Sequence, residues 1–356
     1  MVREELSRLR IDPITNLANA PTATVGLIGD SRKPCVALRS DIDALPILEN
    51  TGVPYASKTP GRMHACGHDG HMANLLGTAA VLKKIEADLP VCVKLIFQPA
   101  EEGGAGADRL VKAGVLDGRV GPKVTKIFGL HGWPGLPVGM ISTRPGPLLA
   151  ATDTFRVVFR GVGCHGAFPH MGKDPIVAAS EAVMTLQQVV SREIDPTEPS
   201  LITVGMFNAG TAVNIIPDEA KLEGTVRTLT PAARKQANAA LKRRCEGIAL
   251  AHGQDVTVEL SDGYPPTIND TACAEYVAQT ARKTLGADRY IPAARPVMGG
   301  EDFAYYLEHV PGCFFMLGVV PQGRSEYPPL HSDRYDFNDD ALPAGIRMFV
   351  ELVRGA

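Results

Sequence analysis

The order of apolar runs in the first half of the chain constrains the fold more than any other feature. Three short runs are rich in β-branched and aliphatic residues, as buried strands are: CVALRSD (35–41), VCVKLIF (91–97) and VTKIFGL (124–130). Between the first two, residues 67–89 place Leu75, Ala79 and Leu82 at helical spacing. A strand, a helix and a strand at this spacing predict a βαβ unit, and therefore a mainly parallel sheet.

The pattern changes near residue 150. Strands with alternating polarity and two helices follow in the order βαββαβ, which is typical of a ferredoxin-like domain: strand 153–161, helix 175–191, strands 200–207 and 220–228, helix 231–252 and strand 255–262. From about residue 265 the chain returns to helix, strand and helix. We expect an α/β catalytic domain (1–150 and 265–356), with a mainly parallel mixed sheet and flanking helices, interrupted by an inserted α+β domain (151–264).

Composition excludes several classes of protein. The chain has 356 residues, which suits two domains, and a formal net charge of −3 that provides no basic field for nucleic acid. No apolar run reaches the roughly 18–20 residues that span a bilayer, so no membrane partner is expected. The seven cysteines are scattered and form no disulfide framework. A reducing, cytoplasmic location is therefore expected.

Polar residues follow the predicted strands repeatedly. Asp41 and Asp43 end the first strand, the pair Glu101 and Glu102 ends the second, and His131 ends the third. The carboxyl ends of parallel strands meet at one edge of a sheet, which is where ligands bind in open α/β folds. The remaining candidates for this edge lie in the loop before the first helix and after the last strand: Cys66, His68 and His331.

Two details favour a metal centre at this edge. Cys66 and His68 are two residues apart, so in an extended loop both side chains would face the same way. Glu101 and Glu102 are adjacent and would diverge, so that one could bind metal while the other remains a base. Thiolate, imidazole and carboxylate are ligands of zinc or manganese. From the residues alone, a cysteine nucleophile with a histidine base and a non-catalytic metal site stay open.

These segments carry a resemblance that covers almost the whole chain. The sequence resembles the aminoacylase, hippurate hydrolase and indole-3-acetyl-amino-acid hydrolase family of dimetal amidohydrolases, within a metallopeptidase superfamily. The matching segments occur in family order: LRSDIDALP (38–46), GRMHACGHDGHMA (61–73), FQPAEEGGAGA (97–107), GLHGWP (129–134), GCHGAFPHMGKDP (163–175), VNIIPDEAKLEGTVRT (213–228), MGGEDFAYY (298–306) and PLHSDRYDFND (329–339). The family usually has a further segment with an HxxPE motif before the point where this sequence begins, and no implied metal ligand falls in it.

The resemblance implies a role for each matching residue. Two divalent metal ions per subunit, Zn²⁺ or Mn²⁺, would be held by five ligands: Cys66, His68, Glu102, His131 and His331. Glu101 would be the general base, and Asp43 would orient the ligands from behind. His165 would reach the active site of the neighbouring subunit of a homodimer and stabilise the oxyanion. Asn214 and Arg227 would bind the substrate.

The implied reaction is hydrolysis of an N-acyl amino acid to a carboxylic acid and a free amino acid, with the inserted domain serving as dimerisation domain and lid. A small-dipeptide metallopeptidase of the same fold is the main alternative. A Cys66-nucleophile amidase and a non-catalytic metal-binding protein are the others. We expect no nucleic-acid partner.

Overall fold

The computed structural model describes residues 1–324 and 326–356. The chain divides into two compact units. Unit 1 comprises Met1–Leu148, Thr267–Arg295 and Asp302–Ala356. Unit 2 comprises Leu149–Pro266 and Pro296–Glu301. The segment that interrupts unit 1 in the sequence thus has a contact network of its own.

A seven-stranded sheet forms the centre of unit 1, in the order β1-β3-β2-β4-β15-β5-β14. Its strands are β1 (Thr24–Ile28), β2 (Cys35–Asp41), β3 (Cys92–Gln98), β4 (Val124–Pro137), β5 (Ile141–Thr143), β14 (Tyr290–Pro292) and β15 (Gly312–Val320). The four neighbours β3, β2, β4 and β15 run parallel, whereas β1 is an antiparallel edge strand and β5 runs antiparallel to β15. The predicted mainly parallel mixed sheet is confirmed.

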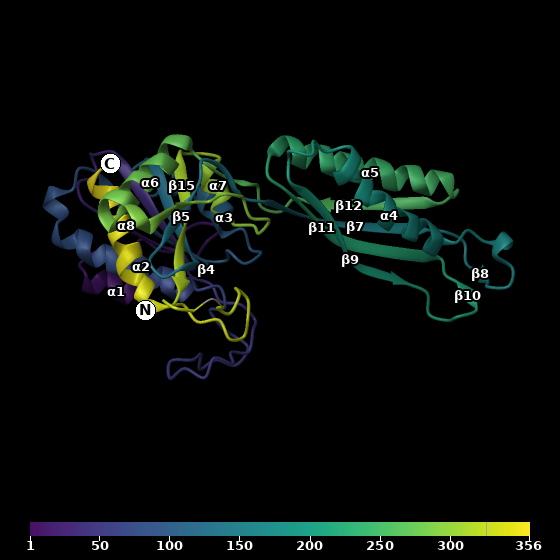
Figure 1. The fold of residues 1–356 in the computed structure, drawn as a ribbon, viewed down its shortest axis with the longest axis horizontal. Coiled ribbons are helices and arrows are strands. Elements are labelled where there is room, and N and C mark those ends of the chain that lie inside the picture. Colours follow the sequence, from purple (N-terminus) through teal and green to yellow (C-terminus); the bar gives the residue numbers. More distant parts are fainter. Residues whose placement is uncertain (325) are drawn as a thin grey trace. The chain divides into compact units, whose positions relative to one another are not determined.

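Helices cover both faces of this sheet (Figure 1). The helices of unit 1 are α1 (Val2–Arg8), α2 (His68–Lys84), α3 (Gly106–Ala113), α6 (Thr271–Leu285), α7 (Ala304–Leu307) and α8 (Leu342–Arg354). On one side α8 packs between α2 and α6, and α1 packs on α2, while α3 and α7 contact each other on the opposite side. The apolar core beneath α2 and α8 includes Leu75, Leu82, Phe349 and Leu352. The apolar residues that predicted the first helix therefore face this core.

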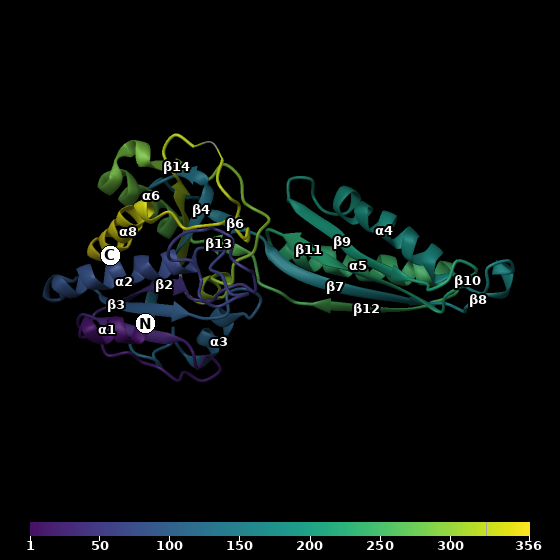
Figure 2. The same ribbon diagram turned by 90° about the horizontal axis from the view of Figure 1, so that it is seen from below.

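Unit 2 is a four-stranded antiparallel sheet in the order β12-β7-β11-β9, with two helices on one face (Figure 2). Its main elements are β7 (Ala151–Arg160), α4 (Pro175–Arg192), β9 (Ser200–Ala209), β11 (Glu219–Thr228), α5 (Pro231–Ala251) and β12 (Asp255–Ser261). Asp174 and Thr230 cap the two helices by accepting hydrogen bonds from backbone N–H groups. The observed order is the predicted βαββαβ pattern.

Four short strands complete the fold. They pair as β13 (Thr267–Asn269) with β6 (Gly146–Leu149), and as β10 (Ile215–Ile216) with β8 (Cys164–His165). In the sequence β8 lies between β7 and α4, and β10 lies between β9 and β11; in space the two strands lie at one end of unit 2 (Figure 1). Among the described residues, no helix is both long and apolar enough to cross a membrane.

Candidate metal centre

The parallel strands of unit 1 bring the candidate site residues to the same level of the sheet. In β2, Arg39 pairs with Gly129 of β4, and Asp41 pairs with Gln98 of β3. Asp41 and His131 are therefore level with each other, and Glu101 follows only three residues after the end of β3. The prediction that His131 ends its strand is wrong, because β4 continues to Pro137. Its register with β2 still places His131 at the predicted edge.

The loop containing Cys66 and His68 differs from the expected extended backbone. Gly67 has a left-handed conformation with φ 80°, and His68 is the first residue of α2. Glycine adopts this conformation without the steric cost that a Cβ atom brings. The two side chains nevertheless converge, because potential ligand atoms of Cys66, His68 and His131 all lie within 4.8 Å of one another. Cys66 Sγ is 3.4 Å from His131 Nε2. A glycine turn, and not strand alternation, places these two candidate ligands together.

The five predicted ligands form two groups that share one residue. The first group is Cys66, His68 and His131, and the second is Cys66, Glu102 and His331. Within each group the potential ligand atoms all lie within 4.8 Å of one another. Cys66 could therefore donate its sulfur to a metal ion held by either group. The donor set fits zinc or manganese.

The loop that carries His331 is tied to the loop that carries Cys66. The His331 backbone N–H donates to the Ala65 carbonyl oxygen over 2.8 Å, and His331 Nε2 lies 3.1 Å from Glu102 Oε1. His331 also has a positive φ of 66°, which is uncommon for a residue with a side chain. Such backbone strain occurs often at functional sites, where surrounding contacts enforce it.

The hydrogen bonds of His68 and His131, the two buried histidines among the candidate ligands, test whether the cluster suits a metal. His131 Nδ1 contacts the Gly132 carbonyl oxygen at 2.7 Å, which assigns the proton to Nδ1 and leaves the Nε2 lone pair facing Cys66. His68 Nδ1 lies 3.0 Å from the Asp43 carbonyl oxygen. Its other nitrogen, Nε2, is buried and has no hydrogen-bond partner among the described residues. Metal-binding histidines normally donate their second ring nitrogen in this way, so the cluster fits a metal.

The pKa values of the candidate ligands are shifted by their burial and by the neighbouring carboxylates. Burial raises the pKa of the Cys66 thiol, and the carboxylates of Glu102 and Glu101 raise it further. Burial also lowers the pKa of His131 to about 3. For His68, burial lowers the pKa, but Asp41 and Asp43 outweigh it and raise the value to about 9. Divalent cations would supply the charge that favours a thiolate and neutral imidazoles here.

Glu101 and Asp43 lie next to these ligands. The Glu101 carboxylate is buried, and its Oε1 lies 3.4 Å from the Asp302 backbone nitrogen. Asp43 Oδ2 accepts a hydrogen bond of 3.0 Å from the Glu102 N–H, and its Oδ1 lies 3.4 Å from His68 Nδ1. Asp43 therefore contacts two candidate ligands from behind, which is where the family resemblance places it. The roles of both carboxylates stay predictions.

Sequence reasoning did not identify Arg39 and Asp302, which connect Asp41 and His71 into a set of buried polar residues next to the ligands. Arg39 donates to Asp41 and Asp302, and His71 bridges Asp41 to the backbone of Gly132. An arginine inside an otherwise apolar strand was the available signal, because a buried charge needs partners. Its partners lie far along the chain, and the sequence does not identify them.

The three predicted site residues of unit 2 lie in two places. His165 pairs with Ile215 in the β8–β10 ladder, and the adjacent Gly166 N–H donates to the Asn214 carbonyl oxygen, so His165 and Asn214 are neighbours. Arg227 pairs with Thr152 near the other end of β11. Arg227 is eight positions along β11 from Glu219, the end of the strand that follows β10, which corresponds to roughly 26 Å. Within one unit 2, Arg227 does not lie with the other two.

The site and fold together define a class: an α/β domain with a candidate two-metal centre at the carboxyl edge of its mainly parallel sheet. Residues 37–355 match the family model described as peptidase family M20/M25/M40. The chain therefore belongs to this family of hydrolases, and its relatives include enzymes that act on amide bonds.

Several characterised relatives are similar over most of their length. N-acetyl-L-cysteine deacetylase of Bacillus subtilis is 45% identical over 82% of this chain and 68% of its own length. IAA-amino acid hydrolase ILR1-like 4 of Arabidopsis thaliana is 38% identical over 99% of this chain and 79% of its own. A crystal structure of a dinuclear metal-binding M20 peptidase from Bacillus subtilis superposes with a TM-score of 0.84 at 36% identity, over 99% of this chain and 89% of that one.

Proposed function

We propose that this chain hydrolyses the amide bond of N-acyl amino acids, releasing a carboxylic acid and a free amino acid. The observation that supports this most directly is the pair of ligand groups that share Cys66, with the buried Glu101 carboxylate beside them. A closed structural metal site has no use for such an extra carboxylate. Relatives named as a deacetylase of N-acetylcysteine and a hydrolase of IAA-amino acids favour this substrate class.

In the proposed reaction the protein residues position the water and move its proton. Two divalent metal ions bound by Cys66, His68, Glu102, His131 and His331 would make water more acidic and polarise the amide carbonyl. Glu101 accepts the proton of the attacking water and later delivers it to the leaving nitrogen. Asp43 holds the Glu102 backbone and His68 in place during both steps. Zn²⁺ or Mn²⁺ suits the ligands, and the cysteine favours Zn²⁺.

The substrate and the oxyanion would be bound by unit 2. In this proposal the guanidinium of Arg227 pairs with the substrate carboxylate, with a further contact from Asn214. His165 donates to the developing oxyanion. Because Arg227 lies near the opposite end of β11 from His165, we propose that His165 and Asn214 serve the active site of a second subunit.

A homodimer through unit 2 would supply that second subunit. β9 is an edge strand of the four-stranded sheet, so its outer N–H and C=O groups are available to another strand. It exposes Met206 and Phe207, whose side chains are 53% and 41% accessible, and the neighbouring helix α4 exposes Val177 and Met184. Exposed apolar residues along an unpaired edge support an interface between two copies of this unit.

Replacing the proposed base tests the function. Glu101→Gln should retain two metal ions per subunit, because Glu101 belongs to neither group that shares Cys66. Its kcat for N-acetyl, N-benzoyl and indole-acetyl amino acids should fall by about 10²–10⁴. Metal analysis and steady-state kinetics on the reconstituted enzyme measure both quantities. Undiminished turnover by this variant would refute the base assignment, and no turnover of the whole panel by the wild type would refute the substrate class.

Subunit mixing tests the role of His165. Glu101→Gln and His165→Ala subunits should each be nearly inactive alone. In a mixed dimer one site combines an intact Glu101 with a His165 from the other subunit. Random exchange of equal amounts should therefore restore about a quarter of wild-type activity, since half the dimers are mixed and each has one complete site. No recovery despite proven subunit exchange would mean that His165 does not act across the dimer.

A dipeptide metallopeptidase is the second candidate. Thermostable carboxypeptidase 1 of Saccharolobus solfataricus is 37% identical over 97% of this chain and 86% of its own length. Adding dipeptides to the substrate panel distinguishes the two, because the ratio of kcat/KM values measures the preference directly.

The Cys66-nucleophile alternative is tested by chelation. A thiol enzyme should retain activity in EDTA, whereas a metal enzyme should lose it and recover with Zn²⁺ or Mn²⁺. The raised pKa of the buried Cys66 thiol disfavours a free thiolate nucleophile. Cys66→Asp should keep residual activity only if residue 66 is a ligand.

A further inference from the structure

We propose that Arg39 is a positioning residue that connects the proposed base Glu101 with the histidine side of the metal centre through two separate arms. One arm runs through Asp302 to Glu101, and the other runs through Asp41 and His71 to the backbone beside His131. We call Arg39, Asp41, His71, Gln98 and Asp302 the Arg39 network. The inference rests on the proposed function where it takes Glu101 as the base.

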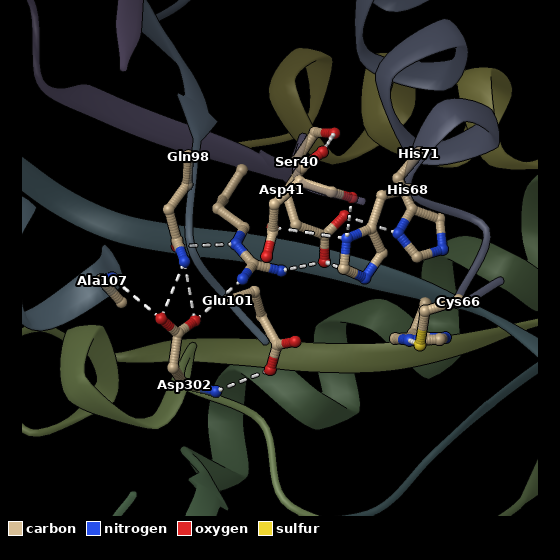
Figure 3. Close-up of polar contacts among 12 residues, drawn as sticks. Ser40, Asp41, Cys66, His68, His71, Gln98, Glu101, Ala107 and Asp302 are labelled. Carbon is tan, nitrogen blue, oxygen red and sulfur yellow. Dashed lines mark hydrogen bonds and ion pairs between the residues drawn. The ribbon is translucent and has the colours of Figure 1, made fainter. Parts of the chain in front are cut away.

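The Asp302 arm fixes the peptide that contacts Glu101. Arg39 Nη2 donates to Asp302 Oδ1 over 2.9 Å, Gln98 Nε2 lies 2.8 Å from both carboxylate oxygens, and the Ala107 N–H donates to Oδ2 over 2.9 Å. Figure 3 shows Asp302 held between Gln98 and Ala107, with Glu101 next to the backbone nitrogen of residue 302. The Asp302 side chain is thus held by hydrogen bonds on several sides. The backbone N–H of Asp302 contacts the Glu101 carboxylate, which would accept the proton.

The Asp41 arm fixes the backbone next to His131. Arg39 Nη1 donates to Asp41 Oδ2 over 2.7 Å, and His71 Nδ1 donates to Asp41 Oδ1 over 2.7 Å. The other ring nitrogen of His71, Nε2, accepts a hydrogen bond of 2.8 Å from the Gly132 N–H. Gly132 in turn offers its carbonyl oxygen to His131 Nδ1. His71 uses both ring nitrogens in this chain, which places it behind the ligands.

Burial makes this arrangement stiff and also costly. Arg39, Asp41 and Asp302 are all 0–1% accessible, and one guanidinium serves two carboxylates. Replacing buried ion pairs by apolar residues is often neutral or stabilising, so stability alone is a poor reason for such a group. Both of its arms end on groups that the proposed reaction uses. A fixed geometry for those groups is what the network provides.

Two variants separate the arms. Asp302→Asn removes the charge that Arg39 holds while keeping the side-chain shape. His71→Asn places its amide near the former Nδ1, so it can still reach Asp41 but loses the acceptor for the Gly132 N–H. His71→Gln places its amide near the former Nε2 and should restore that contact. Asp117→Asn is the matched control, because Asp117 also pairs with an arginine but lies on the surface.

The readouts are steady-state kinetics and Co²⁺ titration of the metal-depleted full chain, in which the Cys66 thiolate gives a charge-transfer band. Asp302→Asn should lower kcat about 10–100-fold with little change in KM, Co²⁺ affinity or the cobalt spectrum. His71→Asn should weaken Co²⁺ affinity about 10–100-fold and alter the spectrum, and His71→Gln should recover much of both. Asp117→Asn should match the wild type.

Other outcomes would overturn the proposal. If Asp302→Asn disturbed Co²⁺ binding as much as His71→Asn, the arms would not be separate. If it left kcat unchanged, or if all network variants lowered only the unfolding midpoint, the network would be structural. Failure of the proposed base is distinguishable, because active Glu101→Gln enzyme would refute that assignment while the Co²⁺ readout of the histidine arm would still apply.

Discussion

The two units bury different kinds of side chain. Among the described residues, unit 1 buries charged and polar groups on its strands, on α2 and in the loops beside them: Arg39, Asp41, His68, His71, Lys94, Gln98, Glu101, His131 and Asp302. In the described part of unit 2 the buried polar side chains are Asp153, Thr228 and Glu301, and the core between its helices and sheet is apolar. An apolar core is sufficient for a fold of this size. The buried charged and polar groups of unit 1 include the candidate metal ligands His68 and His131 and the Arg39 network, and unit 2 has no comparable cluster among its described residues.

The largest effect on stability should follow from removing the charge at the centre of the Arg39 network. Arg39→Leu leaves Asp41 and Asp302 buried without their shared cation, which should cost about 3–5 kcal/mol of unfolding free energy. Urea denaturation of the metal-free protein measures this. The exposed pair of Arg119 with Asp117 provides the control, and Arg119→Gln should change little. A loss below about 1 kcal/mol for Arg39→Leu would mean that its partners are resolvated.

A comparable loss in unit 2 should arise from packing alone. Leu241 on α5 is fully buried in the apolar core, so Leu241→Ala should cost about 2–5 kcal/mol. Unlike the network variants, it should leave Co²⁺ binding and the cobalt spectrum unchanged. A changed cobalt spectrum in Leu241→Ala would contradict the separation of the two cores.

Metal should stabilise unit 1 and not unit 2. Binding only to the folded state contributes about 2.7 kcal/mol when free metal is 100 times the Kd. Chelation should therefore lower the unfolding midpoint followed by a probe in unit 1, whereas hydrogen exchange of β7 and β11 should be unaffected. Equal destabilisation of both units by chelation would contradict the prediction that metal stabilises only unit 1.

The smallest of these effects concerns the buried carboxylate of unit 2. Burial would raise the pKa of Asp153, but hydrogen bonds from Arg234, Asn238 and the Gly263 N–H lower it below the usual value. Asp153→Asn should cost about 1–3 kcal/mol at pH 7. Because the folded-state pKa is lowered, this contribution is complete above the unfolded pKa near about 4 and disappears as pH falls through the folded value.

The difference in unfolding free energy between Asp153→Asn and the wild type should thus be constant from about pH 8 to pH 5. It should become smaller below about pH 4. Urea titrations across this range measure it. Asp262→Asn is the matched control, since Asp262 lies 3.7 Å from the same arginine but is exposed. A gap that widened in acid would show that the Asp153 carboxylate does not stabilise the fold.

The main elements of both units could be predicted because their signals are local. β2, β3, α4, α5 and β12 each produce a run or alternation that is visible within the element. Short strands such as β1 and β14 were missed. They consist of three to five residues whose pairing depends on a neighbour elsewhere in the chain.

The candidate site could be predicted in its residue types and only partly in its geometry. Strand ends and the family resemblance pointed to Cys66, Glu102 and His131, which the fold brings together, although their roles as ligands stay predictions. The extended loop expected at Cys66 was wrong because a left-handed glycine turn leads directly into α2. Arg39 and Asp302 are 263 positions apart, and no local pattern reports such a contact.

The sequence by itself determined the order of the main strands and helices and the kinds of donor atom available, because periodicity and residue chemistry are properties of neighbouring positions. Only the tertiary structure decided which ring nitrogen of His131 faces Cys66 and which carboxylates share Arg39. The physical reason is that a histidine's free nitrogen is set by the hydrogen bond of its other nitrogen. A buried charge is likewise paired by whatever distant strands the sheet places beside it.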